Sequence, residues 1–96
     1  MTRIALGRTT TTAGAMAAIL EAGENPARLL QRHAVGDWGD LSADDVIANK
    51  EATEHEGDPN RQLRVVSAYK LASGVTVWVI TEWDRSSTIL LLPDEY

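Results

Sequence analysis

Hydrophobic and polar positions alternate most regularly over the last third of the chain, and there they predict three β-strands. Apolar and β-branched residues fill Leu63–Leu71, Val75–Glu82 and Ser87–Leu92. Ala72–Gly74 forms a short glycine-containing turn between the first two runs, and Pro93 ends the third. The second run is apolar on both faces, which is typical of a central strand covered on two sides. We therefore expect helices on one face and a helix or a second subunit on the other.

Helical periodicity predicts three helices in the first half of the chain, each preceded by a residue that favours a helix N-cap. Their expected spans are Ala13–Ala22, Pro26 to about Ala34, and Ala43 to about Glu54. The expected N-caps are Thr12, Asn25 and Ser42. The apolar positions expected to face inward are Met16, Ile19, Leu20, Leu29, Leu30, Val46 and Ile47.

The first twelve residues carry no strong pattern for either a helix or a strand. Arg3–Leu6 is apolar enough for an edge strand, with a disordered start as the alternative, and Gly7–Thr12 is expected to be a hydroxyl-rich loop. Its four consecutive threonines disfavour helix because their χ1 angles are restricted. The predicted fold is α+β, with two to three N-terminal helices packed on a three-stranded antiparallel meander. We expect one domain over residues 1–96, helical over about 12–56 and a meander over about 62–93.

Size and composition exclude several classes of protein. A chain of 96 residues has room for one core and a shallow groove rather than a deep cavity. No segment approaches the ~18 apolar residues of a membrane span, and the start lacks the apolar core of a signal peptide. The absence of cysteine excludes disulfides, thiol catalysis and thiolate metal sites. A soluble cytoplasmic protein without membrane contact is therefore expected.

The charge is acidic and uneven. The formal net charge is −5, so direct binding to nucleic acid is not expected. Seven of the fourteen acidic residues fall between Asp40 and Asp58, where Lys50 is the certain cation. Such a cluster is usually a solvated helix face, and the alternative is an acidic surface that binds a basic partner.

His33 is the first candidate for chemistry, with Asp37 four residues later. Glu82 and Asp84 follow at a turn of the meander. Histidine and carboxylates suit a metal site or an acid–base pair, which a small hydrolase or nuclease would use together with Arg85. The common metal-binding spacings of two histidines are absent, and no metal or cofactor is predicted. The simpler interpretation is a protonated His33 at a helix C-terminus, stabilised by the helix dipole and Asp37.

The turn Glu82–Ser86 concentrates two carboxylates, a guanidinium, a hydroxyl and an indole. Arg85 could bind a phosphate together with Ser86 and Thr88. Asp84 and Ser86 are also ordinary turn residues, because their side chains bond the local backbone. A third interpretation pairs Arg85 with Asp37 and fastens the helical part to the sheet.

Three tryptophans supply most of the aromatic bulk in a chain without phenylalanine. Trp38 and Trp78 are expected in the core. Trp83 lies beside the turn, where it either folds back or anchors an interface. We expect the glycine-framed bend at Trp38 to lie beside Asp84–Ser86, so that one binding surface forms. Its expected members are Arg32, His33, Asp37, Trp38, Trp83, Asp84, Arg85, Ser86 and Thr88.

Two motifs are visible once these elements are placed. The first reads Arg32-His33-x-x-Gly36-Asp37-Trp38-Gly39, and the second reads Glu82-x-Asp84-Arg85-Ser86-x-Thr88, continued by Leu91-Leu92-Pro93-x-Glu95-Tyr96. Asp45, Asn49, Ser67 and Tyr69 belong to the same pattern. Together they resemble a family of small bacterial proteins carried on plasmids and other mobile elements. The likeness covers about Thr12–Tyr96, and the family has no settled biochemical activity.

The resemblance has limits of its own. Trp83 stands where the pattern usually has alanine, and the linker Glu54–Gln62 is longer than usual. Some members carry a restriction-modification label. A methyltransferase needs a Rossmann-like fold with a glycine-rich cofactor loop, and this chain has no such loop.

The leading hypothesis is an acidic, non-enzymatic accessory protein of a mobile element that acts by binding another protein. The partner would be a host defence protein, as for an anti-CRISPR or anti-restriction factor, or a toxin, or a component of plasmid maintenance. One alternative is the small hydrolase or nuclease described above. Another is a structural homodimer that buries a sheet face or edge against its twin.

Overall fold

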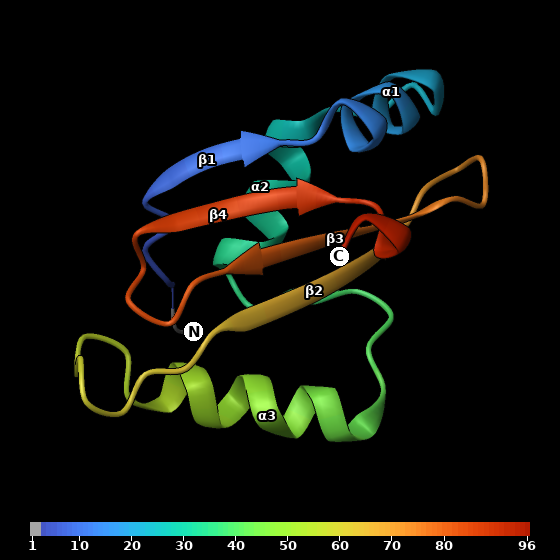
Figure 1. The fold of residues 1–96 in the computed structure, drawn as a ribbon. Helices are drawn as coiled ribbons and strands as arrows, with labels where there is room; N and C mark the ends of the chain where they lie inside the picture. Colours follow the sequence, from blue (N-terminus) through green and yellow to red (C-terminus); the bar gives the residue numbers. More distant parts are fainter. Residues whose placement is uncertain (1–2) are drawn as a thin grey trace.

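The computed structural model describes residues 3–96, and these residues form an α+β fold, as predicted. Three helices precede a C-terminal antiparallel meander of three strands, and a short strand comes before the first helix (Figure 1). The elements are β1 (Arg8–Thr11), α1 (Ala13–Glu21), α2 (Pro26–Ala34), α3 (Ala43–Glu54), β2 (Val65–Lys70), β3 (Thr76–Thr81), β4 (Ser87–Leu91) and the 3-10 helix η1 (Pro93–Glu95). None of the helices within residues 3–96 has the length and apolar character needed to cross a bilayer.

The sheet has the strand order β1-β4-β3-β2. β2, β3 and β4 pair antiparallel, with Ala68 opposite Trp78 and Trp78 opposite Leu91. β1 pairs parallel with β4, so the sheet is mixed and has four strands rather than three. The strands of the meander are one or two residues shorter at their ends than the hydrophobic pattern predicted.

The fourth strand is not where it was expected. Arg3–Leu6 is not a strand, and the strand falls at Arg8–Thr11, within the stretch predicted to be a loop. The physical reason is that the restricted χ1 angle of threonine, which disfavours helix, also favours an extended chain. Ile4 is buried instead, and its N–H donates to the Ala34 carbonyl at 3.0 Å.

All three predicted N-caps are confirmed. The Thr12 hydroxyl accepts from the Ala15 N–H at 3.0 Å, and the Asn25 carboxamide accepts from the Ala27 N–H at 2.9 Å. The Ser42 hydroxyl accepts from the Asp45 N–H at 3.2 Å. Each cap satisfies a backbone donor that has no partner inside its helix, which fixes where the helix begins.

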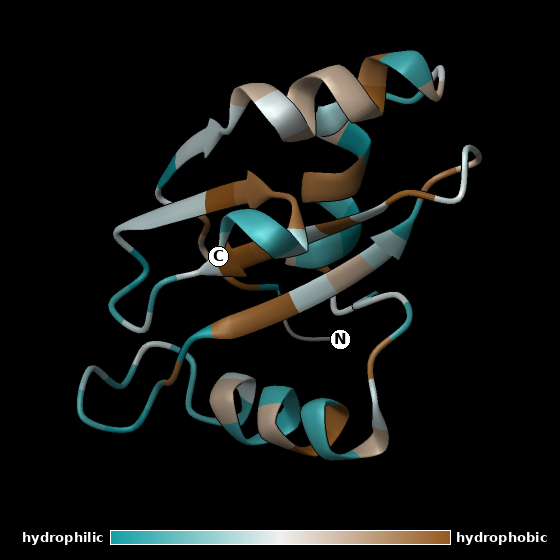
Figure 2. Ribbon diagram, turned by 45° about the vertical axis from the view of Figure 1, so that its right-hand side comes forward, coloured by the Kyte–Doolittle hydropathy of each residue, from teal (hydrophilic) through white to brown (hydrophobic). Residues whose placement is uncertain are grey.

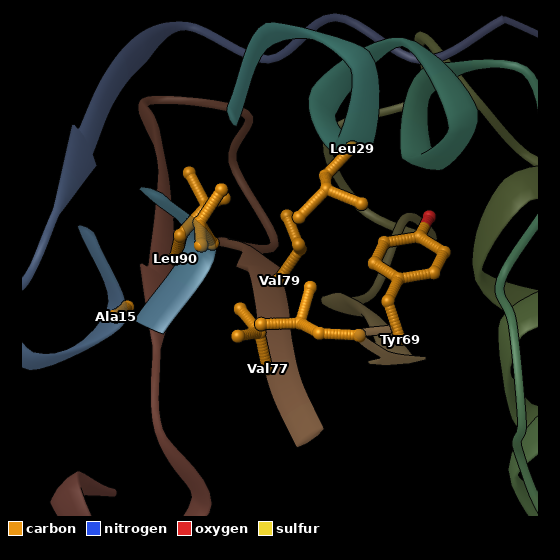
Figure 3. Close-up of a cluster of buried hydrophobic side chains, with 8 residues drawn as sticks. Ala15, Leu29, Tyr69, Val77, Val79 and Leu90 are labelled. Atoms are coloured by element: carbon orange, nitrogen blue, oxygen red, sulfur yellow. The ribbon is translucent and has the colours of Figure 1, made fainter. Parts of the chain in front are cut away.

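The main core lies between the sheet and the helices α1 and α2. Side chains from both helices meet Tyr69, Val77, Val79 and Leu90 of the three meander strands (Figure 3). Tyr69 and Val77 are cross-strand partners, as are Val79 and Leu90, so one face of the sheet carries these residues. Figure 2 shows the hydrophobic stretches running along the central strands.

Two apolar residues predicted to face inward are exposed. Leu20 is 61% exposed, because the inner face of α1 is formed by Ala15 and Ile19. Ile47 is 57% exposed, and the buried residues of α3 are Asn49 and Ala52. α3 lies along the edge of the sheet rather than over a face (Figure 1), and it contacts the rest of the protein through Asn49 and through Ala52, which packs with Ile4 and Val65.

The backbone groups at the outer edge of β2 are bonded by α3 and by the bend at Trp38. The Asn49 carboxamide donates to the Val66 carbonyl at 2.7 Å and accepts from the Val66 N–H at 3.2 Å. Further along, the Ala68 N–H donates to the Trp38 carbonyl at 3.0 Å, and the Asp40 N–H donates to the Ala68 carbonyl at 2.8 Å. The edge therefore has few free backbone groups left for pairing with another strand.

Within residues 3–96, no α-helix packs across the face of the sheet turned away from α1 and α2. η1 packs on β3 there and lies with the C-terminus in front of this face in Figure 1, while α2 lies behind the sheet. The expectation of helices on one face is confirmed, and cover of the other face by a second subunit stays a prediction. We call the uncovered side the open face; it carries Val66, Ala68, Trp78, Ile80, Ile89 and Leu91.

Candidate functional site

His33 is fully buried and joins α2 to the sheet through hydroxyl groups. Its Nδ1 lies 2.6 Å from the Ser67 Oγ, and its Nε2 lies 2.8 Å from the Thr81 Oγ1. Thr81 Oγ1 lies 2.7 Å from Thr88 Oγ1, which donates to the Leu6 carbonyl at 2.7 Å. Each hydroxyl has one proton to donate. Thr81 must therefore donate to Thr88 and accept from Nε2–H, and in a neutral imidazole Nδ1 then accepts from the Ser67 hydroxyl.

Burial decides the charge of the imidazole, because these contacts place a proton on Nε2 and leave Nδ1 free to donate or accept. Burial, and secondarily the positive charge of Arg85, lowers the pKa of His33 from 6.5 to about 4. The prediction of a protonated His33 held by Asp37 is therefore wrong. The helix dipole at the C-terminus of α2 is outweighed by the loss of water around a side chain with no exposed surface.

Asp37 pairs with Arg32 instead. The Arg32 Nε lies 2.6 Å from the Asp37 Oδ2, and this ion pair holds the pKa of Asp37 below its usual range. The Arg32 guanidinium also stacks 4.4 Å from the centre of the Tyr69 ring. The Tyr69 hydroxyl donates to the Asp37 carbonyl at 2.5 Å, and burial raises the pKa of Tyr69 to about 12. The predicted binding residues Arg32 and Asp37 thus fasten the bend that follows α2.

Arg85 points inward and binds the protein itself. Its guanidinium forms a forked ion pair with Glu56, with Nη2 at 2.7 Å and Nε at 3.0 Å from the Glu56 Oε1. Nη1 donates to the Leu63 carbonyl at 2.7 Å and to the Glu82 carbonyl at 3.0 Å. Nη2 also donates to the Ala52 carbonyl at 3.3 Å. Neither the phosphate site nor the pairing with Asp37 is found, because these partners use the whole donor fork.

The predicted catalytic set does not converge. His33 contacts hydroxyls, and Asp84 is exposed, where its Oδ1 accepts from the Ser86 N–H at 3.0 Å. Hydrogen bonding from Ser86 holds the pKa of Asp84 below its usual value, as expected for a turn. No cluster of three metal-ligating side chains occurs in the part of the chain that the structure describes. Within residues 3–96, no hydrogen bond or ion pair joins the Trp38 bend to the Asp84–Ser86 turn.

A groove runs along the open face beside α3. One hollow of about 390 Å³ has a floor of Val66, Ala68, Trp78 and Ile80. A second hollow of about 520 Å³ continues it between α3 and the turn after β3. The two hollows share Asp45, Arg64 and Val66, so we treat them as one feature, the open-face groove.

Large apolar side chains are exposed along the open-face groove. Trp83 is 53% exposed and Leu63 is 52% exposed, and both line the second hollow. Tyr96 lines the first hollow, packs edge-on against Trp78 with 5.8 Å between ring centres, and bonds through its hydroxyl to the Arg64 guanidinium. Isolated exposed apolar residues are common, whereas here several of them line one groove.

The rim of the open-face groove is acidic. Asp40 and Asp45 line the first hollow, and Glu82 lines the second. Arg64 is the one cation that lines either hollow within the described chain, and Tyr96 occupies it. A ligand of this groove therefore meets an apolar floor and a negative edge.

Only part of this surface was predicted from the sequence. Trp83 was expected either to fold back or to anchor an interface, and its side chain is exposed. Val66, Leu63 and Arg64 were missed, because strand alternation shows which residues share a face but not which face lacks a helix. Asp45 and Tyr96 were not among the predicted binding residues.

Comparisons with protein-family models, with curated proteins and with solved structures find no match to this chain.

Proposed function

We propose that this chain is a non-catalytic binding protein whose open-face groove holds a basic segment of a protein partner. The observation that carries the proposal is the row of exposed apolar residues in a groove on the helix-free face of the sheet. Aromatic side chains that are partly exposed in the free protein supply much of the binding energy at such surfaces. Trp83 is the expected anchor, with Leu63 beside it.

Charge determines the kind of partner. The groove carries Asp40, Asp45 and Glu82, and its cation Arg64 is already bonded to Tyr96. Acidic rims favour lysine and arginine and repel acidic segments, which affects specificity and association rate more than affinity. The partner segment should therefore carry basic residues beside one aromatic or aliphatic residue.

The resemblance to proteins of mobile elements suggests where such a partner would be found. Under this proposal the chain binds a host defence protein, a toxin or a protein of plasmid maintenance, and it acts by covering a basic surface. Inhibition of a nuclease that binds nucleic acid through basic residues is one form of this function.

A displayed library of random peptides selected against the wild-type protein tests the proposal. Selected peptides are expected to combine lysine or arginine with an aromatic or aliphatic residue. Trp83→Ala should weaken their binding by roughly 30-fold, which corresponds to an anchor worth about 2 kcal/mol. Leu20→Ala is the matched control, because Leu20 is similarly exposed but lies on α1.

A second pair of variants tests the contribution of the acidic rim to binding. Asp45 lines the groove and Asp44 does not, although both lie in the first turn of α3. Asp45→Asn should weaken binding and reduce its salt dependence, whereas Asp44→Asn should change neither strongly. Failure to enrich any peptide, or enriched peptides that are acidic or indifferent to Trp83→Ala, would overturn the proposal.

A further inference from the structure

β1 ends the sheet with one edge free. The Arg8 N–H donates to the Ser86 carbonyl and the Thr12 N–H donates to the Leu90 carbonyl, each at 3.0 Å. Because bonding alternates along a strand, the peptide groups of Thr9 and Thr11 face away from β4. Outside the β1–β4 ladder, no hydrogen bond within residues 3–96 uses the backbone of Thr9 or Thr11. Figure 1 shows β1 as the outermost strand.

This edge has little protection. Exposed edges are commonly blocked by proline, lysine, a bulge or a covering element, and β1 has none of these; its protection consists of its short length of four residues and the charge of Arg8. A hollow of about 200 Å³ lies beside it, lined by the strand and by Met16, Pro26 and Leu30. Leu20 is one helical turn from Met16 and is 61% exposed, so α1 continues the apolar surface.

We propose that β1 pairs antiparallel with β1 of a second copy of this chain, across a two-fold axis at Thr10. In this register Thr9 of one copy faces Thr11 of the other, and the two pairs exchange four backbone hydrogen bonds. A register centred on Thr9 would pair Thr11 with Gly7, whose φ of +62° is not extended, and one centred on Thr11 would pair Thr9 with Ala13, the first residue of α1. The side chains of Thr9 and Thr11 point to the helix side of the sheet, toward the hollow beside β1.

Charge complementarity also supports a second copy of the chain as the partner of β1, and it supports the register centred on Thr10. Arg8 of one copy lies opposite Thr12 of the other, and the Thr12 hydroxyl donates to Glu95 at 2.7 Å. Within the described residues Arg8 has no ion pair, and Glu95 has no cationic partner. The two-fold axis therefore brings Arg8 of each copy beside Glu95 of the other, and the favourable contact forms twice.

The proposed dimer does not depend on the proposed peptide binding, because β1 and the open-face groove share no residue. The two proposals can therefore fail separately. Trp83→Ala should leave the dimer unchanged, and a variant that abolishes the dimer should still bind selected peptides.

Sedimentation over a series of protein concentrations tests the dimer. The wild type should approach twice the mass of one chain as concentration rises. Thr9→Pro should remain a monomer, because proline removes an outward N–H and places its ring at the new interface, while the bonds to β4 are kept. A wild type that stays monomeric throughout, or a dimer that Thr9→Pro leaves intact, would show the proposal to be wrong.

A charge exchange tests the register. Arg8→Glu and Glu95→Arg each place two like charges together and should each lower the dimer fraction severalfold. An equimolar mixture of the two variants should restore it, because both contacts are then between opposite charges. Lys70→Glu is the control and should have no effect. No rescue in the mixture would exclude this register.

An introduced cysteine tests directly whether the two-fold axis lies at Thr10, because the chain has no cysteine of its own that could form a competing disulfide. Thr10 would face its own copy in a non-hydrogen-bonded pair, where the Cα atoms lie about 4.5 Å apart, close enough for a disulfide. Thr10→Cys should form disulfide-linked dimers rapidly on mild oxidation, and Ser73→Cys in the β2–β3 turn should not. Equal rates for the two variants would contradict the proposal.

Discussion

Most of the polar residues that were candidates for catalysis or binding form hydrogen bonds or ion pairs inside the protein. His33, Asn49 and Arg85 each bond a helix or a linker to a strand or its turn. Buried polar groups of this kind are costly unless every donor and acceptor is satisfied, and here the partners are present. Trp83 lies instead on the surface. At the scale of the residue, the buried polar side chains stabilise the fold, and the exposed Trp83 is the proposed anchor.

Arg85 should matter for stability. Arg85→Met leaves Glu56 without its cationic partner and removes the guanidinium donors from the carbonyl groups of Leu63, Trp83 and Ala52, so it should lower the free energy of unfolding by about 3 kcal/mol. Arg61→Met is the matched control, because Arg61 is exposed and lies 3.7 Å from Asp58. Its effect should stay within about 0.5 kcal/mol. Urea denaturation measures both, and equal losses would refute the internal role of Arg85.

His33 should make stability depend on pH. Its folded pKa is about 4 against 6.5 for the free side chain, so the unfolded chain binds more protons between these values. Stability therefore rises with pH from about 4 to 6.5, and about 3 kcal/mol is lost on acidification through this window. Titration of the His33 imidazole by NMR should give a midpoint near 4. A midpoint at or above 6.5 would contradict the neutral, buried histidine.

At the scale of the element, the outer edge of β2 is closed by parts of the chain that are not strands. The bend at Gly39 approaches the Ala68 carbonyl so closely that an added Cβ would lie 2.1 Å from its oxygen. Gly39 also has a φ of +73°, which other residues rarely adopt. Gly39 therefore allows the bend to pair with β2.

Gly39→Ala should destabilise the fold strongly. The methyl group forces the bend away from β2 and breaks its two backbone hydrogen bonds, with an expected loss of more than about 2 kcal/mol. Gly57→Ala separates the effect of the positive φ from the effect of the close contact. Gly57 has a φ of +92°, but no atom lies within 4 Å of the added Cβ. That control should lose about 1 kcal/mol. If thermal unfolding shows equal losses, the close approach is unimportant.

The limits of sequence reasoning also appear at this scale. The helix starts were predictable because capping depends on neighbouring residues, and the meander was predictable from strand alternation and turn residues. The position of β1 was missed because the restricted χ1 angles of Thr9–Thr12 were taken only as disfavouring helix, although they also favour a strand. The exposure of Leu20 and Ile47 was not predictable, because it depends on which side of the sheet each helix occupies. When a helix such as α1 is apolar on more than one side, its hydrophobic pattern does not indicate which side faces the sheet.

At the scale of the whole molecule, the sheet divides the protein into a covered face and an open one. α1 and α2 bury one face, and α3 stands at the β2 edge and forms a wall of the open-face groove. The sequence predicted that a second covering was needed and left open whether a helix or a subunit would provide it. The open face is the place where a partner would complete the core, as the apolar floor around Trp78 suggests.

The three tryptophans test this account most directly, because each indole N–H gives a separate NMR signal. Trp78 and Trp83 line the open-face groove, whereas Trp38 packs against the separate cluster of Ile4 and Val65. Addition of a basic peptide selected against the protein should shift the signals of Trp78 and Trp83 and leave that of Trp38 in place. A shift confined to Trp38, or no shift at a saturating peptide concentration, would contradict binding in the groove.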